Sequence, residues 1–119
     1  MAKALAEQGG AAAQYNLGVM YHTGQGVVQD YREAVKWFRK AAERGFARAQ
    51  SNLGLMYANG EGVIQDYVYA HMWLNIAASN GHKDAVKGRD FAAKNMTSSQ
   101  MAEAQKLARS CVAKKYKGC

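Results

Sequence analysis

The chain has 119 residues, enough for one domain with a continuous core but too few for two independent domains. Of these residues 49% are apolar and none is proline, a composition more typical of an all-helical protein than of a β-sandwich. No apolar run approaches the roughly 20 residues that a membrane-spanning helix needs, so no membrane span is expected, and no signal peptide is recognised within this chain.

The formal charge of +7 is concentrated towards the C-terminal end. Residues 1–82 hold seven Lys and Arg against six Asp and Glu, whereas residues 83–119 hold nine against three. A basic end can bind nucleic acid, an anionic surface or an acidic protein, but it is more often a solvated helix. No aromatic–basic interleaving or nucleic-acid motif accompanies it, so nucleic acid is not an expected partner.

The chain contains an internal repeat. Residues 13–48 and 49–84 align without a gap, and 18 of the 36 positions are identical. Repetition with a period of 20–50 residues is typical of a stacked solenoid. Residues 3–9 align with 39–45, which we interpret as the second helix of an earlier, partial repeat. The single domain 1–119 therefore divides into four segments: the end of a partial repeat (1–10), a first repeat (11–46), a second repeat (47–82) and divergent C-terminal capping helices (83–119).

The first half of each repeat is predicted to be a helix that ends in a glycine loop. In the first repeat the apolar residues follow the spacing of one buried helical face: Ala13, Leu17, Met20 and Tyr21. Gly24 and Gly26 then end the helix and allow a loop with positive φ. Gly18 lies within the helix, where glycine costs about 1 kcal/mol relative to alanine, so we expect another helix to pack there through its Trp or an Ala. The second repeat carries the same residues 36 positions later: Leu53, Gly54, Tyr57, Gly60 and Gly62.

The second half of each repeat is predicted to be a helix with an aspartate cap. Asp30 precedes this helix in the first repeat, and Glu33 stands at the third helical position, as in a capping box. Trp37 lies in the apolar stripe of this helix, where core packing is a better account than a ligand cage. Asp66 and Trp73 hold the same positions in the second repeat.

The repeat pattern weakens after residue 82. Residues 85–95 occupy the place of a third first helix, and "TSSQ" at 97–100 predicts a capping box that starts a last helix near 98–115. A divergent and more polar pair of helices is what a solenoid needs to cover its last open face.

These motifs resemble the Sel-one-like repeat (SLR) family, a relative of the tetratricopeptide repeats. Its pattern of Ala, Gln, Leu-Gly, Tyr, paired Gly, Asp, Trp and Ala-Ala is met twice at fixed spacing. The resemblance implies an all-α fold, an α/α solenoid of hairpins stacked into a right-handed superhelix, with the first helices on the concave face. It also implies that the repeated residues are structural and that the variable ones carry function.

The variable positions of the first helices are the candidate binding surface. They recur at i, i+3, i+7 and i+10, on one helical face, and mix apolar with polar side chains. Such a surface suits an extended peptide or a partner helix. The alternative is an ordinary surface in an array whose ligand site lies in other repeats. The residues proposed for partner binding are Tyr15, Val19, His22, Ser51, Leu55, Lys87 and Phe91.

Cys111 and Cys119 are a possible disulfide pair. Eight residues of straight helix span about 12 Å, whereas the Cα atoms of a disulfide lie within about 7 Å. The tail must therefore turn at Gly118 or earlier if the bond forms. We favour the disulfide, and with it a periplasmic or secreted protein over a cytoplasmic one. Two free thiols in a reducing cytosol are the alternative.

Catalytic motifs are missing from the sequence. Some proteins of the resembled family have been associated with penicillin binding and β-lactam hydrolysis, but S-x-x-K, S-D-N and K-T-G do not occur here. His22, His71 and His82 lack the spacing of a zinc site, so we expect no metal and no cofactor. The expected function is that of a monomeric, non-catalytic scaffold that binds a peptide or partner protein of unknown identity on the concave face. The alternatives are a penicillin-binding or β-lactamase-like hydrolase, and a basic C-terminal helix that binds an anionic surface.

Overall fold

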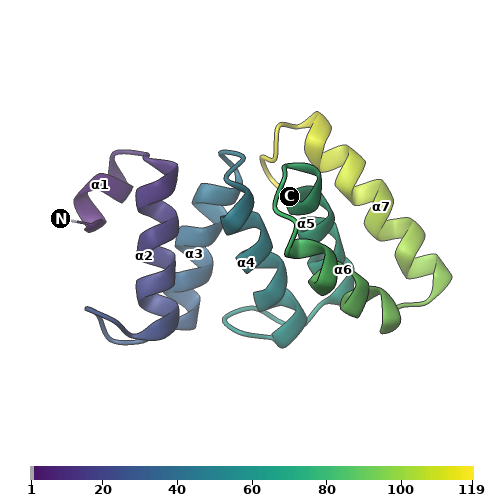
Figure 1. Ribbon diagram of the computed structural model, residues 1–119, viewed down its shortest axis with the longest axis horizontal. Coiled ribbons are helices and arrows are strands. Elements are labelled where there is room, and N and C mark those ends of the chain that lie inside the picture. The colour runs from purple at the N-terminus through teal and green to yellow at the C-terminus, as the bar shows by residue number, and fades with distance from the viewer. Residues whose placement is uncertain (1) are drawn as a thin grey trace.

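The computed structural model describes residues 2–119, and within them it contains helices and no strand. The helices follow one another along an elongated molecule of 45 × 26 × 23 Å, from α1 at one end to α6 and α7 at the other (Figure 1). The predicted all-α helical-repeat solenoid is thereby confirmed. The bounds are α1 (Ala2–Glu7), α2 (Ala11–Thr23), α3 (Tyr31–Ala42), α4 (Ala47–Asn59), α5 (Tyr67–Ser79), α6 (Ala85–Lys94) and α7 (Ser98–Ala113).

The loops α2–α3 and α4–α5 have the same construction. Each first helix ends at a glycine in the left-handed region, Gly24 with φ 78° and Gly60 with φ 68°. In each loop a glutamine side chain donates a 3.0 Å hydrogen bond to the carbonyl seven residues earlier: Gln29 to His22 and Gln65 to Ala58. The glutamine is therefore common to both repeats because it closes the loop.

The second helices begin at the predicted aspartate caps. Each carboxylate accepts the backbone N–H three residues on: Asp30 from Glu33 at 3.2 Å and Asp66 from Tyr69 at 3.1 Å. The predicted capping box of α3 is wrong, however. The Asp30 N–H already donates to the Tyr21 carbonyl at 2.9 Å, and the Glu33 carboxylate lies 3.8 Å from the Lys36 ammonium instead.

The glycines within α2 and α4 mark close contacts between helices. A Cβ on Gly18 would lie 2.6 Å from Cδ1 of Phe38, and one on Gly54 would lie 2.8 Å from Cγ of Leu74 and 3.1 Å from the Ala70 carbonyl oxygen. The expected steric requirement is confirmed. The expected tryptophan partner is wrong, because the residue after the Trp of each repeat makes the contact; an alanine contributes at Gly54 only.

The core lies between the first helices, α2 and α4, and the second helices, α3 and α5, and it continues into α7. Trp73 is fully buried in the main cluster, which includes residues of α3, α4, α5 and α7. Trp37 is also buried, but it belongs to a smaller cluster with Ala6 of α1 and Leu17 of α2. Both tryptophans are core residues, as predicted.

Helix α7 begins at the predicted capping box and then departs from the repeat. Thr97 accepts from the Gln100 N–H at 3.1 Å, and the Gln100 side chain accepts from the Thr97 N–H at 2.9 Å. The helix packs on α5, and its Ala108 and Cys111 join the main core cluster. The chain end after α7 returns to the middle of the array (Figure 1).

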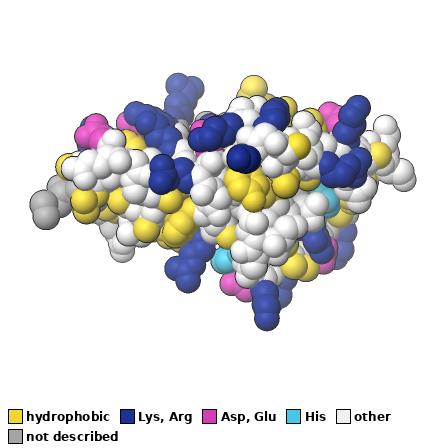
Figure 2. All heavy atoms as spheres, turned by 90° about the horizontal axis from the view of Figure 1, so that it is seen from above, with side chains coloured by type: hydrophobic (Ala, Val, Ile, Leu, Met, Phe, Trp, Pro, Cys, Tyr) yellow, Lys and Arg dark blue, Asp and Glu magenta, His cyan; other side chains and the backbone are white. Residues whose placement is uncertain are grey.

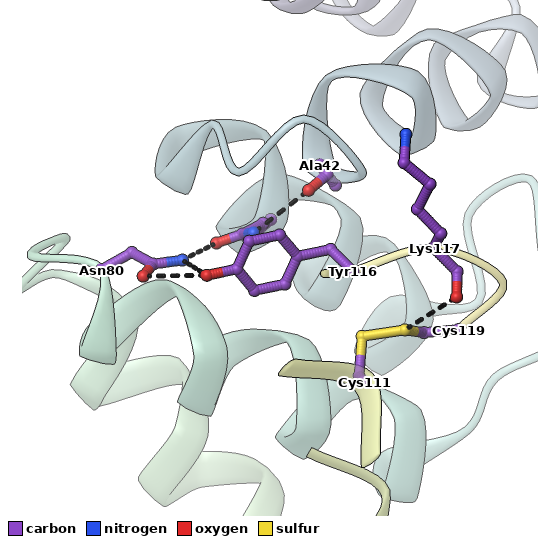
Figure 3. Close-up of a disulfide and its surroundings, with 7 residues drawn as sticks. Ala42, Asn80, Cys111, Tyr116, Lys117 and Cys119 are labelled. Carbon is purple, nitrogen blue, oxygen red and sulfur yellow. Dashed lines mark hydrogen bonds between the residues drawn. A yellow bond between two sulfur atoms is a disulfide. The ribbon is translucent and has the colours of Figure 1, made fainter. Parts of the chain in front are cut away.

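The C-terminal tail is fastened to the α3–α4 turn and to α5. A disulfide joins Cys111 to Cys119, with Cα atoms 5.6 Å apart, and Tyr116 lies between them in sequence (Figure 3). The Tyr116 ring packs against Gly45, where an added Cβ would lie 3.3 Å from the ring atom Cε2. The Tyr116 hydroxyl accepts from the Asn80 amide at 3.2 Å. The tail therefore contacts the ends of both repeats, at Gly45 and at Asn80.

Candidate partner-binding groove between α2 and α4

A hollow of about 230 Å³ lies between the first helices α2 and α4. Its floor is apolar, and its rim carries two amides, an imidazole and a carboxylate. The elements around it are α2, α3, α4 and the loop after α4. The residues that line it are His22, Phe38, Asn52, Leu55, Met56, Asn59 and Glu61.

The rim is held together across the two repeats by one polar contact. His22 Nε2 lies 3.4 Å from Glu61 Oε1, at the long end of the hydrogen-bond range. The His22 ring also packs against Tyr31, with centroids 5.2 Å apart. Since Glu61 follows Gly60 directly, the left-handed turn at the end of α4 directs this carboxylate towards α2.

The same face continues from the hollow towards α6 as an apolar row. Leu55 is 40% exposed, and its counterpart one repeat later, Phe91, is 55% exposed. Phe91 packs edge-on against Tyr67, with centroids 6.4 Å apart. A Cβ on Gly88 would lie 3.2 Å from Leu55 Cδ2, so α4 and α6 approach closely beside this row.

The sequence-predicted binding residues divide into three groups. His22 and Leu55 line the hollow, and Lys87 and Phe91 are exposed on α6. Tyr15 and Val19 are partly buried; Tyr15 packs against Phe38 and Phe46 at centroid distances of 5.9 Å and 5.3 Å.

Ser51 does not belong to the surface on which we expected it. It is only 4% exposed. Helix α4 packs against α3, α5 and α6, whereas α2 packs against α1 and α3. The position that Tyr15 holds on α2, where it is partly buried, is therefore fully covered on α4, where Ser51 holds it. Ser51 is therefore removed from the candidate binding residues.

Three polar residues of the rim were missed from the sequence. Asn52 matches Asn16 in the first repeat, and such repeated residues are expected to be structural. Asn59 and Glu61 occupy positions at which the two repeats differ, because the first repeat has Thr23 and Gln25 there. This difference in sequence could have identified them as candidate binding residues. Only their position beside His22 shows that they share one hollow.

The other histidines show no sign of a metal centre. The residues that the structure describes contain no group of three or more His, Cys, Asp or Glu side chains placed to hold a metal ion. His71 is buried on α5, and burial, helped by Arg89, lowers its pKa, while Asp90 raises it. His71 is therefore expected to be neutral at pH 7.

Basic side chains are distributed widely over the surface. Figure 2 shows Lys and Arg along the whole length of one face, interspersed with apolar and acidic side chains rather than gathered over one element. Within residues 2–119, none of the helices combines the length and the apolar character needed to cross a membrane.

Comparisons with known proteins identify the family. The Sel1 repeat profile matches residues 11–46 and 47–82. A search of curated proteins gives no match. Among solved structures, a protective antigen of uropathogenic Escherichia coli with an SLR fold is 38% identical, with a TM-score of 0.90 over 93% of this chain. This chain spans only 24% of that antigen.

A second solved structure, a Sel1 repeat protein from Oxalobacter formigenes, is 39% identical, with a TM-score of 0.72. That match covers 75% of this chain and 67% of the other. Sel1 repeat proteins are generally protein–protein interaction modules built on non-catalytic scaffolds. The predicted resemblance is confirmed, and the chain belongs to the Sel1 repeat family.

Proposed function

We propose that this protein is a non-catalytic interaction module that binds an extended segment of a partner protein along the exposed face of α2, α4 and α6. The observation that carries this proposal is the continuity of that face. The hollow beside His22 leads to Leu55, and Leu55 leads to Phe91 one repeat further on. Contiguous exposed apolar surface is typical of protein–protein interaction sites.

The spacing of the face suits an extended peptide. Packed helices lie about 8–10 Å apart, and an extended chain advances about 3.3 Å per residue. Every third side chain of such a peptide would therefore reach from α4 to α6, two first helices that contact each other. Leu55 and Phe91 occupy the same position of successive units, so they would receive apolar side chains at that interval.

Selection from a random peptide library on the immobilised protein tests this proposal. Binders are then measured by fluorescence polarisation against wild type and a Leu55→Ser, Phe91→Ser double variant. We expect at least a tenfold loss of affinity in the double variant. Val112→Ser is the matched control, because Val112 is a similarly exposed apolar residue (49%) on α7. Equal affinity for wild type and double variant, or an equal loss in the control, would contradict the proposal.

We also propose that the protein resides in an oxidising compartment, periplasmic or extracellular. The support is the disulfide between Cys111 and Cys119, because structural disulfides persist in such compartments. Cells that produce the protein naturally can be lysed into an alkylating reagent, followed by mass spectrometry. Alkylation of both cysteines without prior reduction would contradict this location.

A further inference from the structure

The hollow lies where the two repeats meet, between α2 and α4. Five of its seven lining positions differ between the two repeats: His22 from Ala58, Phe38 from Leu74, Leu55 from Val19, Asn59 from Thr23 and Glu61 from Gln25. Residues that serve only to stack repeats would be kept, as Gln14 and Gln50 are. The hollow is therefore a local feature that the repeated scaffold does not require.

Its chemistry combines an apolar floor with one carboxylate. Phe38, Leu55 and Met56 supply the floor, and Glu61 is the only acidic residue in the lining. The side-chain amides of Asn52 and Asn59 add carbonyl acceptors. A long basic side chain matches this arrangement, since its methylene stem packs on apolar surface while its charged head pairs with a carboxylate.

Glu61 retains capacity for such a partner. Its contact with His22 involves one oxygen, Oε1, at 3.4 Å. A carboxylate has about four acceptor sites, and charge-assisted bonds to guanidinium are shorter, at roughly 2.7–2.9 Å. The Glu61 side chain is 25% exposed, so an incoming group can reach it from solvent without displacing the core.

We propose that this hollow anchors one arginine or lysine side chain of the partner segment, with its head group on Glu61 and its stem on the apolar floor. This inference rests on the proposed function, because it assigns one subsite of the same face. The volume of about 230 Å³ admits a single large side chain. Because the chain carries a net charge of +7, a uniformly basic peptide is disfavoured, and one basic residue among apolar ones fits best.

A pair of isosteric probes tests the anchor directly. N-acetyl-arginine N-methylamide and its neutral counterpart N-acetyl-citrulline N-methylamide are titrated into ¹⁵N-labelled protein at constant ionic strength. We expect the arginine probe to shift the amide signals of Asn52, Asn59 and Glu61, with at least fivefold higher affinity than the citrulline probe. Equal affinities, or shifts confined to other helices, would overturn the inference.

Charge removal at one position supplies the second arm. In Glu61→Gln the arginine probe should fall to the affinity of the citrulline probe. Glu103→Gln is the control with the same charge change, on α7, which contributes nothing to the hollow. An undiminished preference for arginine in Glu61→Gln would also overturn the inference. The amide spectrum of each variant shows directly whether it is folded.

The two proposals can fail separately. If library peptides lose affinity in the Leu55→Ser, Phe91→Ser variant but the arginine probe shows no preference, the face binds partners and only the anchor is wrong. If the arginine probe binds at Glu61 and no library peptide depends on Leu55 and Phe91, the anchor stands and the extended binding face is wrong.

Discussion

The two repeats use one buried glutamine in the same way, yet its surroundings differ. Gln14 donates to the Ala6 carbonyl at 3.3 Å, and Gln50 donates to the Ala42 carbonyl at 3.1 Å. In the second repeat the Asn80 amide also donates to Gln50 Oε1 at 2.9 Å. Among the described residues, the Gln14 Oε1 atom is buried without a partner. An identical residue therefore contributes differently because a neighbouring residue differs: Asn80 holds the position that Arg44 holds in the first repeat.

The C-terminal tail supports Asn80 in this contact. Asn80 bonds to both Gln50 and Tyr116, and the Tyr116 segment is closed by the disulfide (Figure 3). Lys115 and Tyr116 both adopt positive φ, 55° and 69°, which is unfavourable for residues with a Cβ and needs support from the surroundings. The tail thus clamps the second repeat, whereas the first repeat is covered by the short helix α1.

The largest contrast between the repeats should appear at the two tryptophans. We expect Trp73→Ala to lower the free energy of unfolding by about 4 kcal/mol and Trp37→Ala by about 3 kcal/mol. Trp73 belongs to the main core cluster, while Trp37 packs beside the short helix α1, which can move in to fill part of the cavity. Urea unfolding of both variants measures the difference; a larger loss at Trp37 would contradict this account.

The close contact at Gly18 should have the next largest effect. Gly18→Ala places a methyl group against the buried Phe38 ring, so we expect a loss of about 2 kcal/mol despite the better helix propensity of alanine. In a Phe38→Ala background the overlap is absent, and the same change should be neutral or stabilising. A double-mutant cycle from urea unfolding gives the coupling energy. Additive effects would show that the ring does not limit this position.

Removal of the disulfide between Cys111 and Cys119 should destabilise the second repeat more than the first. We expect Cys119→Ser to cost about 2 kcal/mol, since the disulfide closes a short loop in the unfolded chain. Hydrogen exchange should then increase around Gln50 and Asn80 and remain unchanged around Gln14. A reducing agent should bring wild type to the level of the variant and leave the variant unaffected. Uniformly faster exchange in both repeats would contradict a local clamp.

The fold was largely predictable from the sequence, and the groove was only partly predictable. Repetition identifies residues that stack repeats, so Asp30, Gly18 and Trp37 received the right roles. Repetition cannot tell which helix covers a given face: Ser51 is buried because α4 has neighbours that α2 lacks. Nor can it reveal Asn52, a repeated residue that also lines the hollow.

The sequence likewise did not predict which helix α7 packs against. The capping box at Thr97 predicts where the helix begins, but the direction of a helix depends on the face that remains open. The open face belonged to α5, so α7 packs there and brings Cys111 into the core. The disulfide and the Tyr116 contacts follow from this docking.

The smallest expected effect concerns His71, whose counterpart in the first repeat is Val35. Burial lowers the pKa of His71 below its ordinary value of 6.5, with Arg89 acting in the same direction and Asp90 opposing it. As pH falls below 6.5, the unfolded chain therefore takes up a proton that the folded protein does not, and stability decreases. The His71→Val variant lacks this linkage.

Urea unfolding of wild type and His71→Val between pH 7.5 and pH 5 isolates the contribution, because every other titrating group is common to both proteins. We expect the wild type to lose stability relative to the variant as pH falls, by less than the effects of the three preceding changes. A difference between the two proteins that stays constant with pH would show that His71 ionises as readily in the fold as outside it. In that case burial would not oppose protonation of the His71 imidazole. His71 and Val35 would then differ only in how their side chains pack.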